Sequence, residues 1–376
     1  MNPIPETLLN LVKIYSPSGR ERPAVDYLVG RMKELNFTQA FPDEAGNAVG
    51  VMGSGPRQIV LLGHIDTVPG EIPVRVEPSP LAPSRSTPMG LPEGEGLGMR
   101  VLYGRGSVDA KGPLAAFVDA VAALGPVEGW QVVVIGAVGE EQDSVGARYI
   151  APLYHPEYAI IGEPSRWERV TLGYKGSAWA KITLRRSLAH SAGQGESACE
   201  AAIKVWEAIH AWASAFNADR PRAFDQVLPT LRGMDSGGDG FEEWASLQVG
   251  TRLPPNLPPE KWYVKLNNIP RVAETPGISI KPTGFPIPAY QGEKNTPLVR
   301  AFLTSIRTIG GRPSFVLKTG TADLNIVAPA WGCPALAYGP GDSTLDHTPD
   351  EHLPLEEYRH AVEVIRSVLK RLCQST

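Results

Sequence analysis

The segment QIVLLGHID, residues 58–66, decides the fold: an apolar run ends in a histidine and an aspartate. The run Gln58–Leu62 is rich in β-branched and leucine side chains, as are Trp130–Ala137 and Tyr158–Ile161. Nearly continuous hydrophobicity of this kind is typical of strands that are buried on both faces, as in parallel sheets. The sequence therefore predicts a buried sheet in which these runs are strands.

Helical segments alternate with these strands. Residues 5–14 and 21–35 are predicted helices, and Ser18 with Glu21 forms a possible capping box at the start of the second one. A third helix is predicted at Lys111–Leu124, between the strands Gln58–Leu62 and Trp130–Ala137, because its apolar residues share one face. Alternation of strands and helices predicts an α/β fold with a mixed, mostly parallel sheet and helices on both faces.

The length of 376 residues favours two domains, and the pattern changes near Leu172. Gly176–Leu184 alternates like a half-exposed strand, and a long helix at Glu196–Phe216 follows it. We therefore expect residues 173–285 to form an inserted α+β domain between two parts of the first domain, 1–172 and 286–376. Residues 79–99 are rich in proline and glycine and are predicted to form a surface insertion.

Composition excludes several classes of protein. The formal net charge is −4 and charged residues make up 20%, without the basic excess of a nucleic-acid or membrane binder. The three cysteines form no CxxC pair. The N-terminal segment lacks the basic and apolar regions of a signal peptide, and no apolar stretch is long enough to span a membrane. We therefore expect a cytoplasmic location.

Carboxylates and imidazoles follow the ends of the predicted strands. They occur in GHID after Gln58–Leu62, in GEE after Trp130–Ala137, in GEP after Tyr158–Ile161, in DHT after Ala335–Tyr338, and in GRGSVD before Lys111–Leu124. Each motif alone is more often a solvated turn. Ligands of open α/β sheets gather at the carboxyl ends of the strands, so together the motifs predict a site for two metal ions. The residues concerned are His64, Asp66, Asp109, Glu140, Glu141, Glu163 and His347.

The glycines at 104 and 106 also suggest a phosphate-binding loop. In a Walker loop, however, a lysine and a hydroxyl residue follow the glycines. Here Asp109 stands before the helix instead. A carboxylate at this position favours a cation over a phosphate.

The motifs GHIDTVP, GRGSVDAKG, GEE, GEP and DHT, in this order, resemble the dinuclear zinc aminoacylase and carboxypeptidase family. Its members include acetylornithine deacetylase, succinyl-diaminopimelate desuccinylase and several dipeptidases and carboxypeptidases. The resemblance covers nearly the whole chain. It implies a zinc exopeptidase-like fold, an inserted lid or dimerisation domain, and a homodimer.

The resemblance also implies the roles of the metal ligands. His64, Asp109 and Glu163 would hold one zinc ion, and Asp109 would bridge to a second ion that Glu141 and His347 complete. Carboxylate and imidazole ligands also accept cobalt or manganese, so the sequence does not identify the metal.

Further roles follow from the same resemblance. Glu140 would be the general base that takes a proton from the attacking water, and Asp66 would orient His64. Family members have a cis peptide after the bridging aspartate, which implies one at Asp109–Ala110.

Two regions outside the metal ligands resemble substrate-contacting parts of the family. His190 resembles the lid histidine that stabilises an oxyanion in the site of the partner subunit, although it could also be an exposed loop histidine. Arg252 resembles an arginine that binds a substrate carboxylate, although an ordinary solvated arginine is the alternative. A loop that we assign to substrate recognition contains Lys318, Thr319, Gly320 and Thr321.

The runs 317–325 and 339–351 most resemble the branch that releases lysine or ornithine from the C-terminal glutamate of a small acidic carrier protein, LysW. This implies a metal-dependent amidohydrolase of lysine and arginine biosynthesis. One alternative is a deacylase or dipeptidase of free small substrates, such as N-acetylornithine or N-succinyl-diaminopimelate. Another is an inactive metal-binding regulator, which the presence of Glu140 beside Glu141 disfavours.

Overall fold

The computed structural model describes residues 3–78, 100–188 and 195–374. The predicted insertion at 79–99 and His190 therefore lie outside the described residues. The chain divides into two compact units. Unit 1 comprises Met1–Leu172, Gly292–Val316 and Ile326–Thr376, and unit 2 comprises Gly173–Gln291 and Leu317–Asn325.

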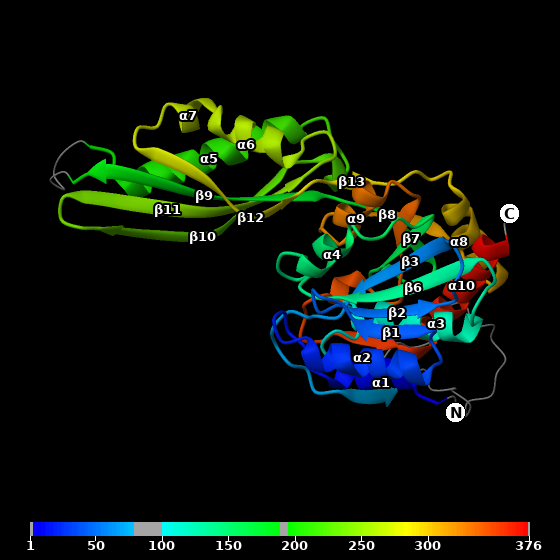
Figure 1. Cartoon of the computed structure of the whole chain (residues 1–376). Helices are drawn as coiled ribbons and strands as arrows, with labels where there is room; N and C mark the ends of the chain where they lie inside the picture. Colours follow the sequence, from blue (N-terminus) through cyan, green and yellow to red (C-terminus); the bar gives the residue numbers. More distant parts are fainter. Residues whose placement is uncertain (1–2, 79–99, 189–194, 375–376) are drawn as a thin grey trace, which may run out of the picture. The chain divides into compact units, whose positions relative to one another are not determined.

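Unit 1 is built around a mixed sheet with the strand order β1-β2-β6-β3-β7-β15-β8 (Figure 1). The pairs β6–β3, β3–β7 and β7–β15 are parallel, and β1–β2, β2–β6 and β15–β8 are antiparallel. The strands are β1 (Gln39–Pro42), β2 (Ala48–Met52), β3 (Arg57–His64), β6 (Trp130–Ala137), β7 (Tyr158–Gly162), β8 (Arg169–Tyr174) and β15 (Ala335–Ala337), with β14 (Ser314–Lys318) beside β8. The buried apolar runs β6, β3, β7 and β15 are thus paired in parallel at the centre of this strand order.

A second, small sheet in unit 1 has the order β16-β5-β4. Its strands are antiparallel: β4 (Arg75–Pro78), β5 (Arg100–Tyr103) and β16 (His352–Pro354). The pairing brings the segment after β5 next to the segment before β16. It therefore joins the GRGSVD and DHTPDE motifs, which are far apart in the sequence.

Helices pack on the large sheet and on one another. The helices of unit 1 are α1 (Glu6–Lys13), α2 (Arg22–Glu34), α3 (Lys111–Leu124), α4 (Val145–Ile150), α8 (Pro297–Thr308), α9 (Leu324–Trp331) and α10 (Leu355–Gln374). Helix α3 contacts β3, β6 and β7 as well as α1 and α10, which explains why most of its residues are buried. Helix α2 packs against β1 and β2.

The predicted capping box at the start of α2 was wrong. The N-cap residue Glu21 makes no side-chain capping bond. Its carboxylate instead accepts from the backbone N–H of Gly19, at 2.9 Å. The Ser18 hydroxyl donates to Asp66 Oδ2 at 2.6 Å, a partner 48 residues away in sequence. A tertiary contact has replaced the local one that the pattern suggested.

Three glycines in register allow α3 to lie close to the sheet. Gly63 of β3 is paired with Gly136 of β6 and with Gly162 of β7. A Cβ atom at Gly63 would lie 3.2 Å from Leu114 Cβ, and one at Gly162 would lie 2.9 Å from Phe117 Cε2. Side chains at these positions would push the helix away. The glycine row therefore sets the distance between α3 and the strand ends that carry the motifs.

Unit 2 is an antiparallel sheet with helices on one side (Figure 1). The strand order is β10-β11-β9-β12, and β13 pairs with the end of β8 at Gly173 and Tyr174. The bounds are β9 (Gly176–Ser187), β10 (Leu228–Gly238), β11 (Glu242–Leu253), β12 (Ile278–Ile287), β13 (Tyr290–Gln291), α5 (Ala198–Asn217), α6 (Pro259–Asn267) and α7 (Pro270–Ala273). Alternate residues of β9 are buried, as the period-two pattern predicted: Ala178, Ala180, Ile182 and Leu184.

The segment Leu317–Asn325 belongs to unit 2, whereas the sequence grouped it with 286–376. Its anchor is Asn325, whose side-chain amide donates to the carbonyls of Tyr174, Lys175 and Pro288 at 3.3, 3.2 and 2.9 Å. Such long-range amide bonds leave no signal in local sequence. A lid or dimerisation role for unit 2 stays a prediction.

The predicted fold class is confirmed: a mixed α/β sheet with helices, together with a separate antiparallel α+β unit. None of the helices within the described ranges has the length and apolar character that crossing a membrane requires.

We expect the substitution Gly63→Ala to lower the free energy of unfolding by about 1–3 kcal/mol, the usual cost of overpacking a core. The added methyl group would meet Leu114 Cβ, which belongs to a buried helix. Gly30→Ala, within α2 and with no atom near the new Cβ, should instead stabilise by about 0.4–1 kcal/mol. Urea unfolding of both variants measures the difference. A Gly63→Ala protein as stable as Gly30→Ala would contradict the close-packing argument.

Candidate metal centre

The motif residues gather where neighbouring parallel strands end. His64 is the last residue of β3, and Glu163 directly follows β7. Two residues separate the end of β6 from Glu140 and Glu141. Since these three strands are parallel neighbours, the four residues lie at one edge of the sheet. Asp109 reaches the same place from the segment that precedes α3.

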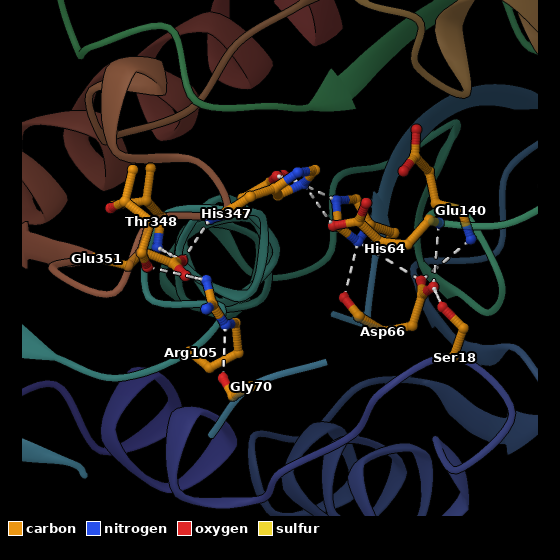
Figure 2. Close-up of polar contacts among 12 residues, drawn as sticks. Ser18, His64, Asp66, Gly70, Arg105, Glu140, His347, Thr348 and Glu351 are labelled. Atoms are coloured by element: carbon orange, nitrogen blue, oxygen red, sulfur yellow. Dashed lines mark hydrogen bonds and ion pairs between the residues drawn. The ribbon is translucent and has the colours of Figure 1, made fainter. Parts of the chain in front are cut away.

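Asp109 lies between two imidazoles. Its Oδ1 is 3.2 Å from His64 Nε2, and its Oδ2 is 3.0 Å from His347 Nε2. The same His347 nitrogen is 3.1 Å from Glu141 Oε1. Figure 2 shows His347 and His64 pointing toward one another, His347 from a loop and His64 from the end of β3. A carboxylate whose two oxygens face different histidines has the arrangement of a bridging ligand.

The donor set fits divalent cations. Ligand atoms of His64, Asp109 and Glu141 all lie within 4.8 Å of one another. Tetrahedral bonds of 2.0–2.2 Å to nitrogen and oxygen place neighbouring ligand atoms about 3.4 Å apart, close to the separations found here. The His64 side chain is 2% exposed, whereas the His347 side chain is 52% exposed. The site therefore has a buried side at His64 and a more open side at His347.

The charges of the cluster depend on one another. Hydrogen bonds to Asp109 and Glu141 raise the pKa of His347 to about 10. Burial alone would lower the pKa of His64, but bonds to Asp109 and Asp66 outweigh it and raise that pKa well above its ordinary value. Burial would raise the pKa of Asp109, yet its bonds with the two histidines lower it. The carboxylates thus require positive charge between them, which protons or metal ions can supply.

Asp66 orients its surroundings mainly through backbone groups. Its Oδ1 and Oδ2 accept from the N–H groups of Glu140 and Glu141, each at 3.1 Å. His64 Nδ1 is 3.0 Å from the Asp66 carbonyl oxygen but 3.5 Å from the Asp66 carboxylate. The expected support of His64 therefore comes chiefly from the carbonyl, which directs the other nitrogen, Nε2, at Asp109. Burial would raise the pKa of Asp66, but the His64 imidazole, the Ser18 hydroxyl and the Glu141 N–H lower it.

Glu140 is held by its backbone while its side chain points away from Asp66 (Figure 2). Its charge contributes to the raised pKa of His64, which places the two side chains in one electrostatic environment. The Glu163 residue is 7% exposed beside the end of β3. The implied cis peptide at Asp109–Ala110 is present.

His347 adopts a left-handed backbone conformation, with φ 62°. This conformation costs a non-glycine residue about 1–2 kcal/mol. The next residue, Thr348, fixes the turn, because its N–H and its hydroxyl donate to the Leu345 carbonyl at 3.1 and 2.8 Å. The His347 side chain is therefore presented by a loop that other contacts have to hold.

Sequence reasoning missed two buried charged residues, Arg105 and Glu351. The Glu351 carboxylate accepts from the N–H groups of Val108 and Asp109 at 2.9 and 3.0 Å and from Arg105 at 2.9 Å. Arg105 lies in GRGSVD and Glu351 in DHTPDE, two segments in which the sequence pattern indicated only Asp109 and His347 as site residues. The sequence did not indicate that Arg105 and Glu351 are buried, because neither residue belongs to an apolar strand pattern.

The residues assigned to substrate lie in unit 2. Arg252 donates to Thr321 Oγ1 at 3.0 Å, so the structure brings the predicted arginine and the predicted loop together. Lys318 lies in the same loop, with its ammonium 5.7 Å from the centre of the Tyr174 ring.

The model of peptidase family M20/M25/M40 matches residues 60–371. A LysW-lysine hydrolase from Deinococcus radiodurans is 43% identical over 98% of this chain and 96% of its own length. A tripeptidase from Staphylococcus aureus superposes with a TM-score of 0.75 at 19% identity, covering 98% of this chain and 97% of the tripeptidase. A protein from Bacillus subtilis described as a dinuclear metal-binding peptidase of the M20 family superposes with a TM-score of 0.67 at 12% identity, covering 98% and 97%.

The family match extends from β3, just before His64, to the end of α10, and so includes all the strand ends that form the cluster. The Deinococcus relative covers both units. This chain therefore belongs to peptidase family M20/M25/M40.

Proposed function

We propose that this protein hydrolyses the amide bond between lysine or ornithine and the C-terminal glutamate of the carrier protein LysW. The observation that carries the proposal is the bridging position of Asp109 between His64 and His347 in a member of this peptidase family. The substrate is inferred from the LysW-lysine hydrolase of Deinococcus, which matches nearly the whole chain.

The ligand set that we propose assigns two divalent ions, with zinc as the metal. His64, Asp109 and Glu163 would hold one ion, and Asp109, Glu141 and His347 would hold the other. The contacts of His347 with both Asp109 and Glu141 support the second set. Cobalt or manganese would suit the same nitrogen and oxygen donors.

The reaction would be metal-assisted hydrolysis. When bound, the ions would polarise the scissile carbonyl and make an attacking water more acidic. Glu140 would take the proton of that water and pass it to the leaving amine. Asp66 would fix the base in place, since its carboxylate holds the backbone N–H groups of Glu140 and Glu141.

Recognition of the amino-acid part would fall to unit 2. We propose that Arg252 binds the substrate carboxylate with the loop Lys318, Thr319, Gly320 and Thr321, because its guanidinium already contacts that loop. His190 is proposed as the oxyanion-stabilising histidine of a homodimer's partner subunit.

Zinc binding should release protons and should strengthen as pH rises from 6 to 8. The pKa of His347 is about 10, so its imidazole is protonated at neutral pH and must lose that proton to bind a metal ion. Calorimetric titrations in buffers of different ionisation enthalpy count the released protons. His347→Ala should reduce the number, whereas His360→Ala, at a histidine in α10 near Glu356, should not. Binding without proton release at pH 7 would contradict the assignment.

Glu140→Gln should retain both metal ions and lower kcat by about 10²–10⁴-fold, the usual contribution of a general base. Metal analysis and turnover of the same preparation test this. Glu44→Gln, at a surface carboxylate bonded to Tyr149, is the control and should change neither quantity. Normal turnover of Glu140→Gln would remove the residue from the mechanism.

Release of lysine from lysyl-LysW should exceed release of acetate from N-acetylornithine, or of succinate from N-succinyl-diaminopimelate, by roughly 100-fold in kcat/KM. Mass spectrometry of the carrier and amino-acid analysis measure the products, and ornithyl-LysW is the parallel substrate. Faster release of acetate or succinate would assign the protein to free small substrates.

A further inference from the structure

Arg105 joins three loops that carry metal-ligand residues. Its Nε donates to the carbonyl of Gly70, in the loop after His64, at 2.8 Å. Its Nη1 donates to the carbonyl of Thr348, the residue after His347, at 3.2 Å. The arginine itself lies four residues before Asp109. Figure 2 shows Gly70, Arg105, Thr348 and Glu351 in one continuous set of contacts.

Glu351 completes this arrangement. Its Oε2 accepts from Arg105 Nη1 at 2.9 Å, and its Oε1 accepts from the N–H groups of Val108 and Asp109. The Glu351 side chain is 1% exposed and that of Arg105 is 8% exposed. A buried carboxylate and guanidinium are costly to desolvate, so a pair that persists here must be held by many bonds. The polar contacts named for the pair lead to the other member or to backbone groups at Val108, Asp109 and Thr348, apart from the bond to Gly70, six residues after His64.

We propose that Arg105 and Glu351 are a positioning pair, which fixes the backbone of Asp109 and His347 at the separation that two metal ions require. The inference rests on the metal centre proposed above. Glu351 sets the direction of the Asp109 backbone through its N–H group. Arg105 sets the position of the loop in which His347 has its left-handed conformation.

Because the named contacts of the pair are with backbone groups and with each other, the pair would act on geometry and not as a ligand. Groups that orient metal ligands typically change metal affinity 10–100-fold when they are replaced. A pair that merely stabilised the fold would instead lower resistance to unfolding and leave affinity unchanged. The two roles therefore predict different measurements.

The test uses the full chain with the substitutions Arg105→Met, Arg105→Lys and Glu351→Gln. Arg31→Met is the matched control, because Arg31 is also little exposed, at 16%, and pairs with Glu6 and Glu34 away from these loops. Calorimetric titration with zinc gives affinity and stoichiometry. Absorption spectra of the cobalt-loaded proteins report ligand geometry, and urea unfolding of the metal-free proteins reports stability.

We expect Arg105→Met and Glu351→Gln to weaken binding of at least one zinc ion 10–100-fold and to alter the cobalt spectrum. Arg105→Lys, which keeps the charge but cannot reach both carbonyls with a planar fork, should restore only part of the affinity. Arg31→Met should bind two ions as tightly as the wild type.

Wild-type affinity and spectra in Arg105→Met and Glu351→Gln would overturn the inference. Loss of folding in all three variants would also overturn it, because the pair would then serve the fold. Failure of the wild type to bind two ions would instead refute the metal centre. If the wild type binds two zinc ions and the variants bind them with the same affinity, only the positioning role would be refuted.

Discussion

The proposed metal centre depends on the close approach of α3 to three glycines of the sheet, Gly63, Gly136 and Gly162. Gly63 and Gly162 each stand one residue before a proposed ligand, and α3 begins two residues after Asp109. The distance between helix and sheet therefore also influences how far Asp109 lies from His64. Because interiors are close-packed, a displaced helix would move the bridging carboxylate with it. Packing in the core thus decides whether one cation can reach both side chains.

Two buried carboxylates hold the segments that carry Asp109, Glu140 and Glu141, and both do so by accepting hydrogen bonds from backbone N–H groups. Asp66 accepts from the N–H groups of Glu140 and Glu141, and Glu351 accepts from those of Val108 and Asp109. In both cases the bonds hold successive backbone N–H groups and do not involve the side chains of those residues. Charge-assisted bonds to backbone N–H groups are strong, and backbone groups have no rotamers to lose. The proposed base Glu140 and the neighbouring proposed ligand Glu141 can therefore be oriented together.

The sequence predicted what depends on local pattern and on the ends of buried strands. The strand Trp130–Ala137 and the helix Lys111–Leu124 have the predicted bounds, because each is a strong apolar run with clear limits. Strand β8 was missed, since Arg169–Tyr174 is short and directly precedes the change of unit. Strands β10 and β11 are longer than their apolar parts, because ladder bonds extend pairing into polar residues.

Within the site, the sequence predicted the residues that meet at Asp109 and the orienting residue Asp66, but not the buried pair Arg105 and Glu351. His64, Glu141 and His347, which contact Asp109 or one another, each follow a predicted strand in the sequence, and this position could be recognised without the structure. Arg105 and Glu351 are 246 residues apart and are joined only by the folded structure. Ser18 illustrates the same limit, because its sequence context favoured a helix cap while its hydroxyl bonds Asp66.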